Sequence, residues 1–149
     1  MTRWLDDDEQ RAWRNFVAAT QLLYATLDRQ LQRDAGMPHA YYVILVGLSE
    51  APERRMRMSE LATWAQSSQS RLSHAVARLE ERGWVRRERC PDDGRGSFAV
   101  LTDEGFAALA GAAPGHVEEV RRRLFDVLGP ERIRALDDIC ATVRDTLER

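Results

Sequence analysis

The 149-residue sequence predicts a mainly helical α+β domain, with about six helices and a two-stranded hairpin between the fourth and the fifth. Apolar residues recur at i, i+3, i+4 and i+7 in Leu72, Ala75, Val76 and Leu79, which is typical of a half-buried helix. Turn-forming residues fill the stretch 91–96, PDDGRG, between two short strand-like segments. Long amphipathic segments flank this region, so we expect one domain over residues 1–149.

The first third of the chain predicts two helices. The first covers residues 6 to about 33, because the carboxylates of Asp6–Glu9 favour the positive end of a helix dipole. Gly36 is expected to end it, and Pro38 can take the first position of the next helix. That helix, His39 to about Glu50, is apolar nearly all round, which indicates burial. The first helix also has an apolar stripe: Phe16, Leu23, Leu27 and Leu31.

The middle of the chain predicts a helix-turn-helix and a hairpin. The expected elements are a loop over residues 51–57, a short helix over Ser59–Trp64, a fourth helix that ends at Gly83, a strand from Trp84 and a return strand over Ser97–Leu101. Ser59 is the expected N-cap of the short helix, and Ser67 or Ser68 that of the fourth.

The C-terminal third predicts two more helices. Thr102 is expected to cap a fifth helix that reaches about Leu128, with a kink or break near Gly111–Gly115 because Pro114 removes a helix hydrogen bond. Gly129-Pro130 then starts a sixth helix. Its apolar seam alternates spacings of three and four: Ile133, Leu136, Cys140, Val143 and Leu147. Such a seam needs a partner helix, either in its own domain or in another copy of the chain.

Positive charge is concentrated in the middle of the sequence. The formal net charge is −2, yet residues 54–95 hold ten Arg against six acidic residues, and each flank has a net charge of −3. All 22 basic residues are Arg, whose planar fork suits phosphate and guanine edges. The local basic excess predicts that the helix–hairpin stretch, rather than the whole surface, meets nucleic acid.

The face of the fourth helix opposite its apolar stripe carries small polar side chains. Ser70, Ser73, His74 and Ala77 share this face, and a merely solvated helix would have long charged side chains there. Small side chains let a helix approach another surface closely. Beside an arginine-bearing hairpin, this face predicts a helix that enters the DNA major groove with a wing next to it.

Several classes of protein are excluded by missing patterns. Cys90 and Cys140 stand alone, so neither a disulfide framework nor a metal site is indicated, and the reducing cytoplasm is the expected compartment. No apolar run has membrane-spanning length, and MTRWLDDDEQ does not resemble a signal peptide. No nucleophile–base pair or glycine-rich phosphate loop is present, so we expect neither an enzyme nor a bound cofactor.

Two motifs resemble the MarR family of bacterial winged helix-turn-helix regulators. LATWAQSSQSRLSHAVARLEERGWV is similar to the family's helix-turn-helix and its Leu-Glu-x-x-Gly-Leu/Trp-Val ending. CPDDGRGSFAVLTDEG is similar to its wing, an Asp-x-Arg followed by Leu-Thr-x-x-Gly. The order of the six helices also matches, so the resemblance covers essentially the whole chain.

The resemblance implies a homodimer that binds double-stranded DNA. Its dimerisation helices would be residues 6–33 and 103–148, and its DNA-binding lobe residues 38–101. The fourth helix would enter the major groove, and the wing Arg95, held by Asp93, the minor groove. Gly94 departs from the family, which usually has a further Arg there, so this wing is expected to grip less strongly or bend more. His74 stands where the family often has Arg, which implies a weaker or pH-dependent contact.

The resemblance and the helix pattern together predict two sets of site residues. The expected DNA-binding residues are Arg57, Ser68, Gln69, Ser70, Arg71, Ser73, His74, Arg78, Asp93 and Arg95. Family members are often released from DNA by small aromatic acids or phenolic ligands, and the residues predicted for such a ligand are Trp13, Arg14, His39 and Tyr41. The simplest alternative for the aromatic members of this second set is a place in the core.

The function predicted from the sequence is a sequence-specific transcriptional regulator, a repressor that binds a pseudo-palindromic operator. The alternative is a winged helix used only as a protein-interaction module without DNA binding. That alternative predicts an apolar or acidic exposed face on the fourth helix, whereas the sequence has a small, polar and basic one.

Overall fold

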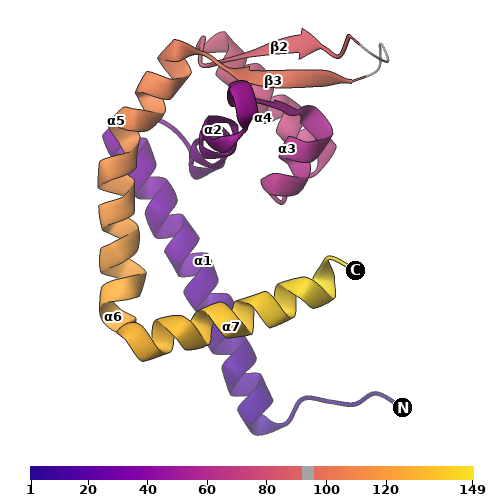
Figure 1. Ribbon diagram of the computed structural model, residues 1–149. Helices are drawn as coiled ribbons and strands as arrows, with labels where there is room; N and C mark the ends of the chain where they lie inside the picture. The colour runs from indigo at the N-terminus through magenta and orange to yellow at the C-terminus, as the bar shows by residue number, and fades with distance from the viewer. Residues whose placement is uncertain (92–95) are drawn as a thin grey trace.

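The computed structural model describes residues 1–91 and 96–149 (Figure 1). The elements in order are α1 (Asp7–Ala35), α2 (His39–Glu50), the 3-10 turn η1 (Pro52–Arg54), β1 (Arg55–Arg57), α3 (Met58–Trp64), α4 (Gln69–Glu81), β2 (Val85–Arg89), β3 (Ser97–Leu101), α5 (Asp103–Val120), the π-helical turn η2 (Arg121–Phe125), α6 (Asp126–Leu128) and α7 (Pro130–Leu147). The predicted fold class is confirmed: a mainly helical chain with a small antiparallel sheet, arranged as a winged helix-turn-helix.

Helix α1 begins with a capping box. The Glu9 backbone N–H donates to Asp6 Oδ1 at 2.8 Å, and the Asp6 N–H donates to Glu9 Oε2 at 3.0 Å. Gly36 ends the helix at φ +63°, a conformation in which glycine has no steric penalty. Pro38 takes the N-cap position of α2 rather than the first helical position, and Asp28 of α1 caps α2 instead by accepting from the His39 N–H at 2.8 Å.

The loop predicted over residues 51–57 is partly wrong. Arg55–Arg57 form strand β1, which pairs antiparallel with β3 and makes a three-stranded sheet of order β1-β3-β2. The prediction that Ser59 caps α3 is also wrong, because the helix begins at Met58 and its N-cap, Arg57, makes no side-chain cap. Ser68 does cap α4, as expected, since its Oγ accepts from the Arg71 N–H at 3.2 Å.

The core of the lobe lies between α2, α3, α4 and the sheet. Its members that are at most 2% exposed include Leu45, Leu48, Leu61, Leu72, Val76, Leu79 and Val85. Burying each side chain of this size contributes roughly 1.5–3 kcal/mol. The predicted stripe of α4 is therefore the side that holds it in the lobe, and its opposite side faces outward.

The two sequence motifs meet where β2 begins and β3 ends. Thr102 Oγ1 donates to the Gly83 carbonyl at 2.6 Å and accepts from the Gly105 N–H at 3.0 Å, which confirms Thr102 as the cap of α5. A Cβ on Gly105 would overlap the carbonyl oxygen of Trp84, so only glycine fits there. Leu-Thr-x-x-Gly is thus a joint between the wing and α5.

Helix α5 continues through Pro114 without the predicted break. Its irregularity lies later, in the π-helical turn η2, after which α6 reaches Leu128 as expected. The α1 and α5 helices pack together and extend from the lobe, while α7 runs beneath it (Figure 1). No residue of α7 is buried: Ile133 and Leu136 of its seam are half-buried, and Cys140, Val143 and Leu147 are exposed. None of the described helices has the length and hydrophobicity needed to cross a membrane.

Candidate nucleic-acid interface

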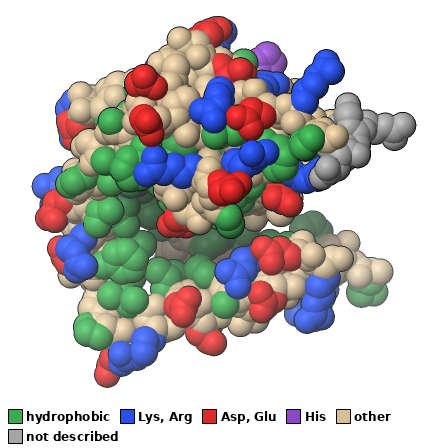
Figure 2. Space-filling view, turned by 45° about the horizontal axis from the view of Figure 1, so that its top comes forward, with side chains coloured by type: hydrophobic (Ala, Val, Ile, Leu, Met, Phe, Trp, Pro, Cys, Tyr) green, Lys and Arg blue, Asp and Glu red, His purple; other side chains and the backbone are tan. Residues whose placement is uncertain are grey.

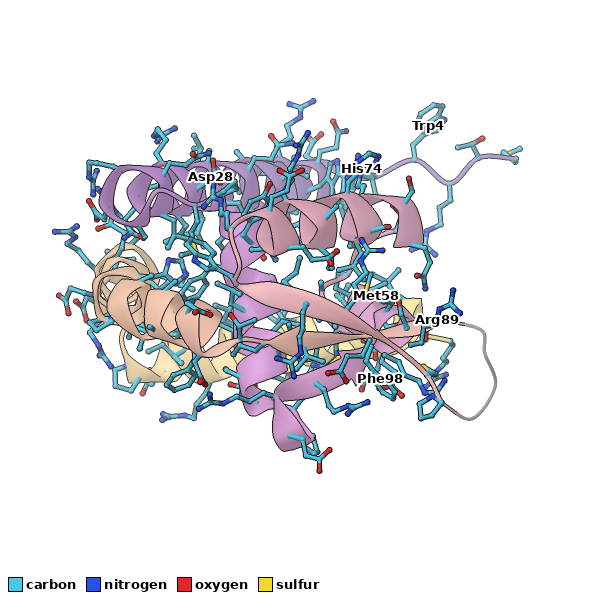
Figure 3. All side chains as sticks on the ribbon, turned by 90° about the horizontal axis from the view of Figure 1, so that it is seen from above. Trp4, Asp28, Met58, His74, Arg89 and Phe98 are labelled. Carbon is cyan, nitrogen blue, oxygen red and sulfur yellow. The ribbon has the colours of Figure 1, made fainter. Side chains whose placement is uncertain are left out.

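The outward face of α4 is polar and open. Ser68, Gln69, Ser70, Arg71 and His74 are exposed, while Ser73 is half-buried. Figure 3 shows the side chains around this surface, with His74 on α4 and Arg89 at the end of β2 labelled. The capped N-terminus of α4 belongs to the same surface, and the positive end of the helix dipole there favours a phosphate.

Three of the predicted DNA-binding residues contact other side chains. Arg78 pairs with Glu81 at 3.2 Å, a surface ion pair that rearranges at little cost. Arg57 lies over the ring of Phe98, 5.4 Å from its centroid. Ser73 accepts from Arg87, an interaction that no sequence pattern indicated.

The wing is only partly described. Asp93 and Arg95 lie outside the described residues, as does Gly94. The strands leading to them are antiparallel, with Arg89 opposite Ser97 and Glu88 opposite Phe98. On the sheet face away from α4, Glu88 pairs with Arg86 at 3.1 Å and with Arg55 at 3.4 Å.

The four residues predicted to bind a ligand do not form one pocket within a chain. Trp13 and Arg14 line a shallow pocket with Trp4 near the start of α1. His39 lines a separate groove, and Tyr41 lies under the guanidinium of Arg82, at 5.3 Å.

The groove beside His39 has a volume of about 620 Å³ and lies between the lobe and α1. Tyr24 of α1, His39 of α2, Trp64 of α3 and Arg71 of α4 all line it, together with the capping residue Ser68. Aromatic rings and a guanidinium in one groove suit an aromatic acid. The sequence missed Tyr24, Trp64 and Arg71 because residues from four helices meet here.

A polar cluster joins α1, α2 and α5 next to this groove. His116, 6% exposed, has its Nδ1 3.1 Å from Gln30 Oε1, and its ring centroid lies 4.3 Å from that of Tyr42 and 5.7 Å from that of His39. Gln30 Nε2 donates to Asp34 Oδ2 at 3.1 Å, so its Oε1 accepts and His116 Nδ1 donates. Burial, and then the neighbouring His39, lower the pKa of His116; burial also lowers the pKa of His39 against the opposing effect of Asp28.

No group of three or more His, Cys, Asp or Glu residues that could hold a metal ion occurs within residues 1–91 and 96–149. Cys90 is buried and Cys140 is exposed, and both are free thiols.

Comparison with known proteins identifies the family that shares this architecture. The model of the MarR family matches residues 35–96, which hold the elements from α2 to β2. Sco3205 of Streptomyces coelicolor, described as a MarR family transcriptional regulator in complex with DNA, is 56% identical, with a TM-score of 0.97 over 100% of this chain and 93% of that one. The chain belongs to the MarR family. The resemblance seen in the two motifs is thereby confirmed, and with it a family of transcriptional regulators rather than of enzymes.

Two further relatives extend the comparison. AbsC, another MarR family regulator of Streptomyces coelicolor, is 46% identical over 99% of each chain, with a TM-score of 0.93. The transcriptional regulator HosA of Escherichia coli O111:H- is 37% identical over 73 residues, 49% of this chain and 53% of HosA. The match to this curated relative thus spans about half its length.

Proposed function

We propose that this MarR family member is a DNA-binding transcriptional repressor that reads a pseudo-palindromic operator as a homodimer. The observation that carries the proposal is the outward face of α4, where small polar side chains and Arg71 surround His74 and no acidic residue intervenes between Gln69 and Leu79. A small-faced helix fits the major groove and brings its polar groups to base edges. The description of Sco3205 in complex with DNA supports the same use of this fold.

The predicted contacts divide by position. Ser70, Arg71, Ser73 and His74 lie toward the N-terminal half of α4 and are proposed to meet base edges or adjacent phosphates. Ser68, Gln69, Arg57 and Arg78 lie around this face and are proposed to meet phosphates. Asp93 and Arg95 at the hairpin tip keep their predicted role in the minor groove.

Exposed apolar side chains support the homodimer. Trp13 and Phe16 on α1 are more than half exposed, and Ile139 and Val143 on α7 are at least half exposed. Figure 2 shows hydrophobic side chains gathered along the hollow beneath the lobe. Leaving such area in water costs about 25 cal/mol per Å², which a second copy covering both helices would recover.

A ligand would act through the groove beside His39. A carboxylate there could pair with Arg71, which also lies on the DNA-facing surface, while Tyr24 and Trp64 would contact its ring. Occupying the groove would withdraw Arg71 from DNA and disturb the cap of α4. Salicylate-like acids at millimolar concentration should then raise the melting temperature and weaken DNA binding; if they do neither, the groove is not a site for aromatic acids.

The DNA-binding proposal is tested by selection of duplexes from a random pool, followed by mobility-shift titration of Ser70→Glu. A carboxylate on this face repels phosphate, so binding should weaken by roughly tenfold or more. Gln21→Glu adds the same charge on the polar side of α1, away from α4 and away from the apolar stripe that contains Phe16, and should bind as the wild type does. Equal binding by the Ser70 variant and its control would show that α4 does not face DNA.

A further inference from the structure

Arg87 is the arginine of β2 that points at the recognition helix. Side chains alternate along a strand, so Val85, Arg87 and Arg89 share one face, and Val85 on that face is buried against the lobe. Arg86 and Glu88 share the opposite face and pair with each other at 3.1 Å. Neighbouring arginines in the sequence therefore have different surroundings.

The guanidinium of Arg87 joins two positions of α4. Its Nε lies 2.8 Å from Glu80 Oε1, and its Nη2 donates to the Ser73 carbonyl at 2.9 Å and contacts Ser73 Oγ at 3.4 Å. Ser73 and Glu80 are seven residues apart, two turns along the same side of the helix. The planar fork thus fixes both the distance and the rotation of α4 relative to β2.

This contact is more sheltered than the neighbouring Arg86–Glu88 pair and about as sheltered as the Arg55–Glu88 pair. The side chains of Arg87 and Glu80 are 32% and 37% exposed, whereas Arg86 is 58% exposed. Donors of Arg87 that are engaged with Glu80 and Ser73 are not offered to a phosphate. The charge of Arg87 is balanced locally by Glu80, which would otherwise repel DNA at the end of α4.

We propose that Arg87, held by Glu80, is a positioning residue that sets the angle between α4 and the β2–β3 wing, and thereby operator discrimination, without contacting DNA. The proposal rests on the DNA-binding function proposed above. A two-part reader needs a fixed relation between its parts, because the helix and the wing must enter adjacent grooves together. Ser73, whose carbonyl and hydroxyl meet Arg87, transmits this constraint to the face that meets base edges.

The test compares Arg87→Ala, Arg87→Lys and Glu80→Gln with two matched controls on the opposite sheet face, Arg86→Ala and Glu88→Gln. Two duplexes are titrated: one selected by the wild type from a random pool, and a shuffled duplex of equal length and composition. The titrations are repeated over a series of salt concentrations. Circular dichroism and light scattering confirm that each variant keeps the fold and the mass of the wild type.

Loss of positioning predicts a particular pattern. Arg87→Ala should bind the selected duplex about tenfold more weakly and the shuffled duplex within about twofold of the wild type, with an unchanged salt slope. Lysine at position 87 should not restore discrimination, because a point charge cannot bridge both partners. Glu80→Gln should also weaken binding to the selected duplex, although it removes a negative charge, while both controls should keep the discrimination of the wild type.

Other patterns would overturn the proposal. A salt slope reduced by about 0.9, with equal losses on both duplexes, would make Arg87 a phosphate contact. If Glu80→Gln bound more tightly than the wild type, as Glu88→Gln would, the Arg87–Glu80 pair would affect binding only through its net charge. If Arg87→Ala does not fold, the titration of Glu80→Gln alone tests the positioning role. A wild type that selects no duplex would defeat the proposed function itself. An Arg87→Ala variant that discriminates as well as the wild type would overturn only the positioning role of Arg87.

Discussion

His116 is an imidazole buried where α1, α2 and α5 meet, and its protonation state matters for that junction. Its Nδ1 already donates to Gln30, so a second proton would add a charge beside the rings of Tyr42 and His39. Titratable groups that face the junction are Asp28 and Asp34 from α1 and His39 and Tyr42 from α2. In the described structure the junction therefore favours neutral histidines.

The pH dependence of stability follows from this preference. The pKa values of His116 and His39 are lowered in the folded state, so the unfolded chain binds more protons below the ordinary histidine value of about 6.5. The stabilising contribution is complete above that pH and is lost as the pH falls through it. The melting temperature of His116→Gln should fall less between about pH 7.5 and 5.5 than that of the wild type, whereas the exposed His74→Gln should follow the wild type. Parallel curves for all three proteins would contradict this account.

Arg95 and Asp93 carry a prediction that rests on the sequence. An Arg placed in a narrow minor groove is attracted by its negative potential, and an Asp two residues earlier can orient it. Arg95→Ala should weaken operator binding by roughly 1–3 kcal/mol and lower the salt dependence. Asp93→Ala should weaken binding too, although it removes a negative charge. Tighter binding by the Asp93 variant in a mobility-shift titration would mean that the wing acts through net charge.

At the scale of elements, periodicity predicted the helices well and missed what depends on distant partners. The bounds His39–Glu50 and Ser97–Leu101 follow from the sequence because their apolar patterns and end signals are local. Strand β1, with the sequence RMR, has no such signal and exists because β3 offers it hydrogen bonds. The contacts of Arg87 and the groove beside His39 were missed for the same reason.

Local sequence preference does not account for the backbone at two positions. A kink or break was expected near Pro114, yet the helix continues through it because packing on α1 outweighs one lost hydrogen bond. Gln66, in the turn before α4, takes φ +52°. This conformation favours glycine, and the sequence around Gln66 does not predict it. At Pro114 tertiary packing overrides the local preference, whereas the hydrogen bonds of Gln66 are local and go to the Thr63 carbonyl.

The joint between the wing and α5 gives a stability prediction. A methyl group at Gly105 would overlap the backbone oxygen of Trp84 and approach Leu101, and backbone cannot yield as a flexible side chain can. Gly105→Ala should therefore lower the free energy of unfolding by about 3 kcal/mol or more. Gly111→Ala, in the same helix with nothing near its added Cβ, should raise it slightly. If urea unfolding showed the same change in free energy for both variants, the close approach of Gly105 to the Trp84 backbone would not matter for stability.

The seam of α7 gives a prediction about assembly. Val143 lies on the seam and is 50% exposed in the single chain, while the preceding residue, Thr142, points about 100° away from it around the helix. Val143→Asp should shift the protein from dimer to monomer at micromolar concentration, because a carboxylate would be buried between two copies. Thr142→Asp adds the same charge and should remain dimeric. Light scattering separates them, and a wild-type monomer would rule out the seam as an interface.

At the scale of the whole molecule, α1 and α5 extend from the lobe and α7 runs beneath it (Figure 1), while the polar face of α4 is exposed. A two-fold axis through the exposed faces of α1 and α7 would relate two copies of α4. Both copies could then enter successive major grooves on one side of a duplex. Symmetry in the protein would therefore appear as symmetry in the operator.

The most direct test is a hydroxyl-radical footprint of the wild-type protein on the duplex that it selects. The account predicts two-fold symmetric protection, with half-sites centred about 10 bp apart and one dimer bound per duplex. A single asymmetric half-site, or the absence of any selected duplex, would contradict the claim that a dimer of this chain reads DNA through paired α4 helices.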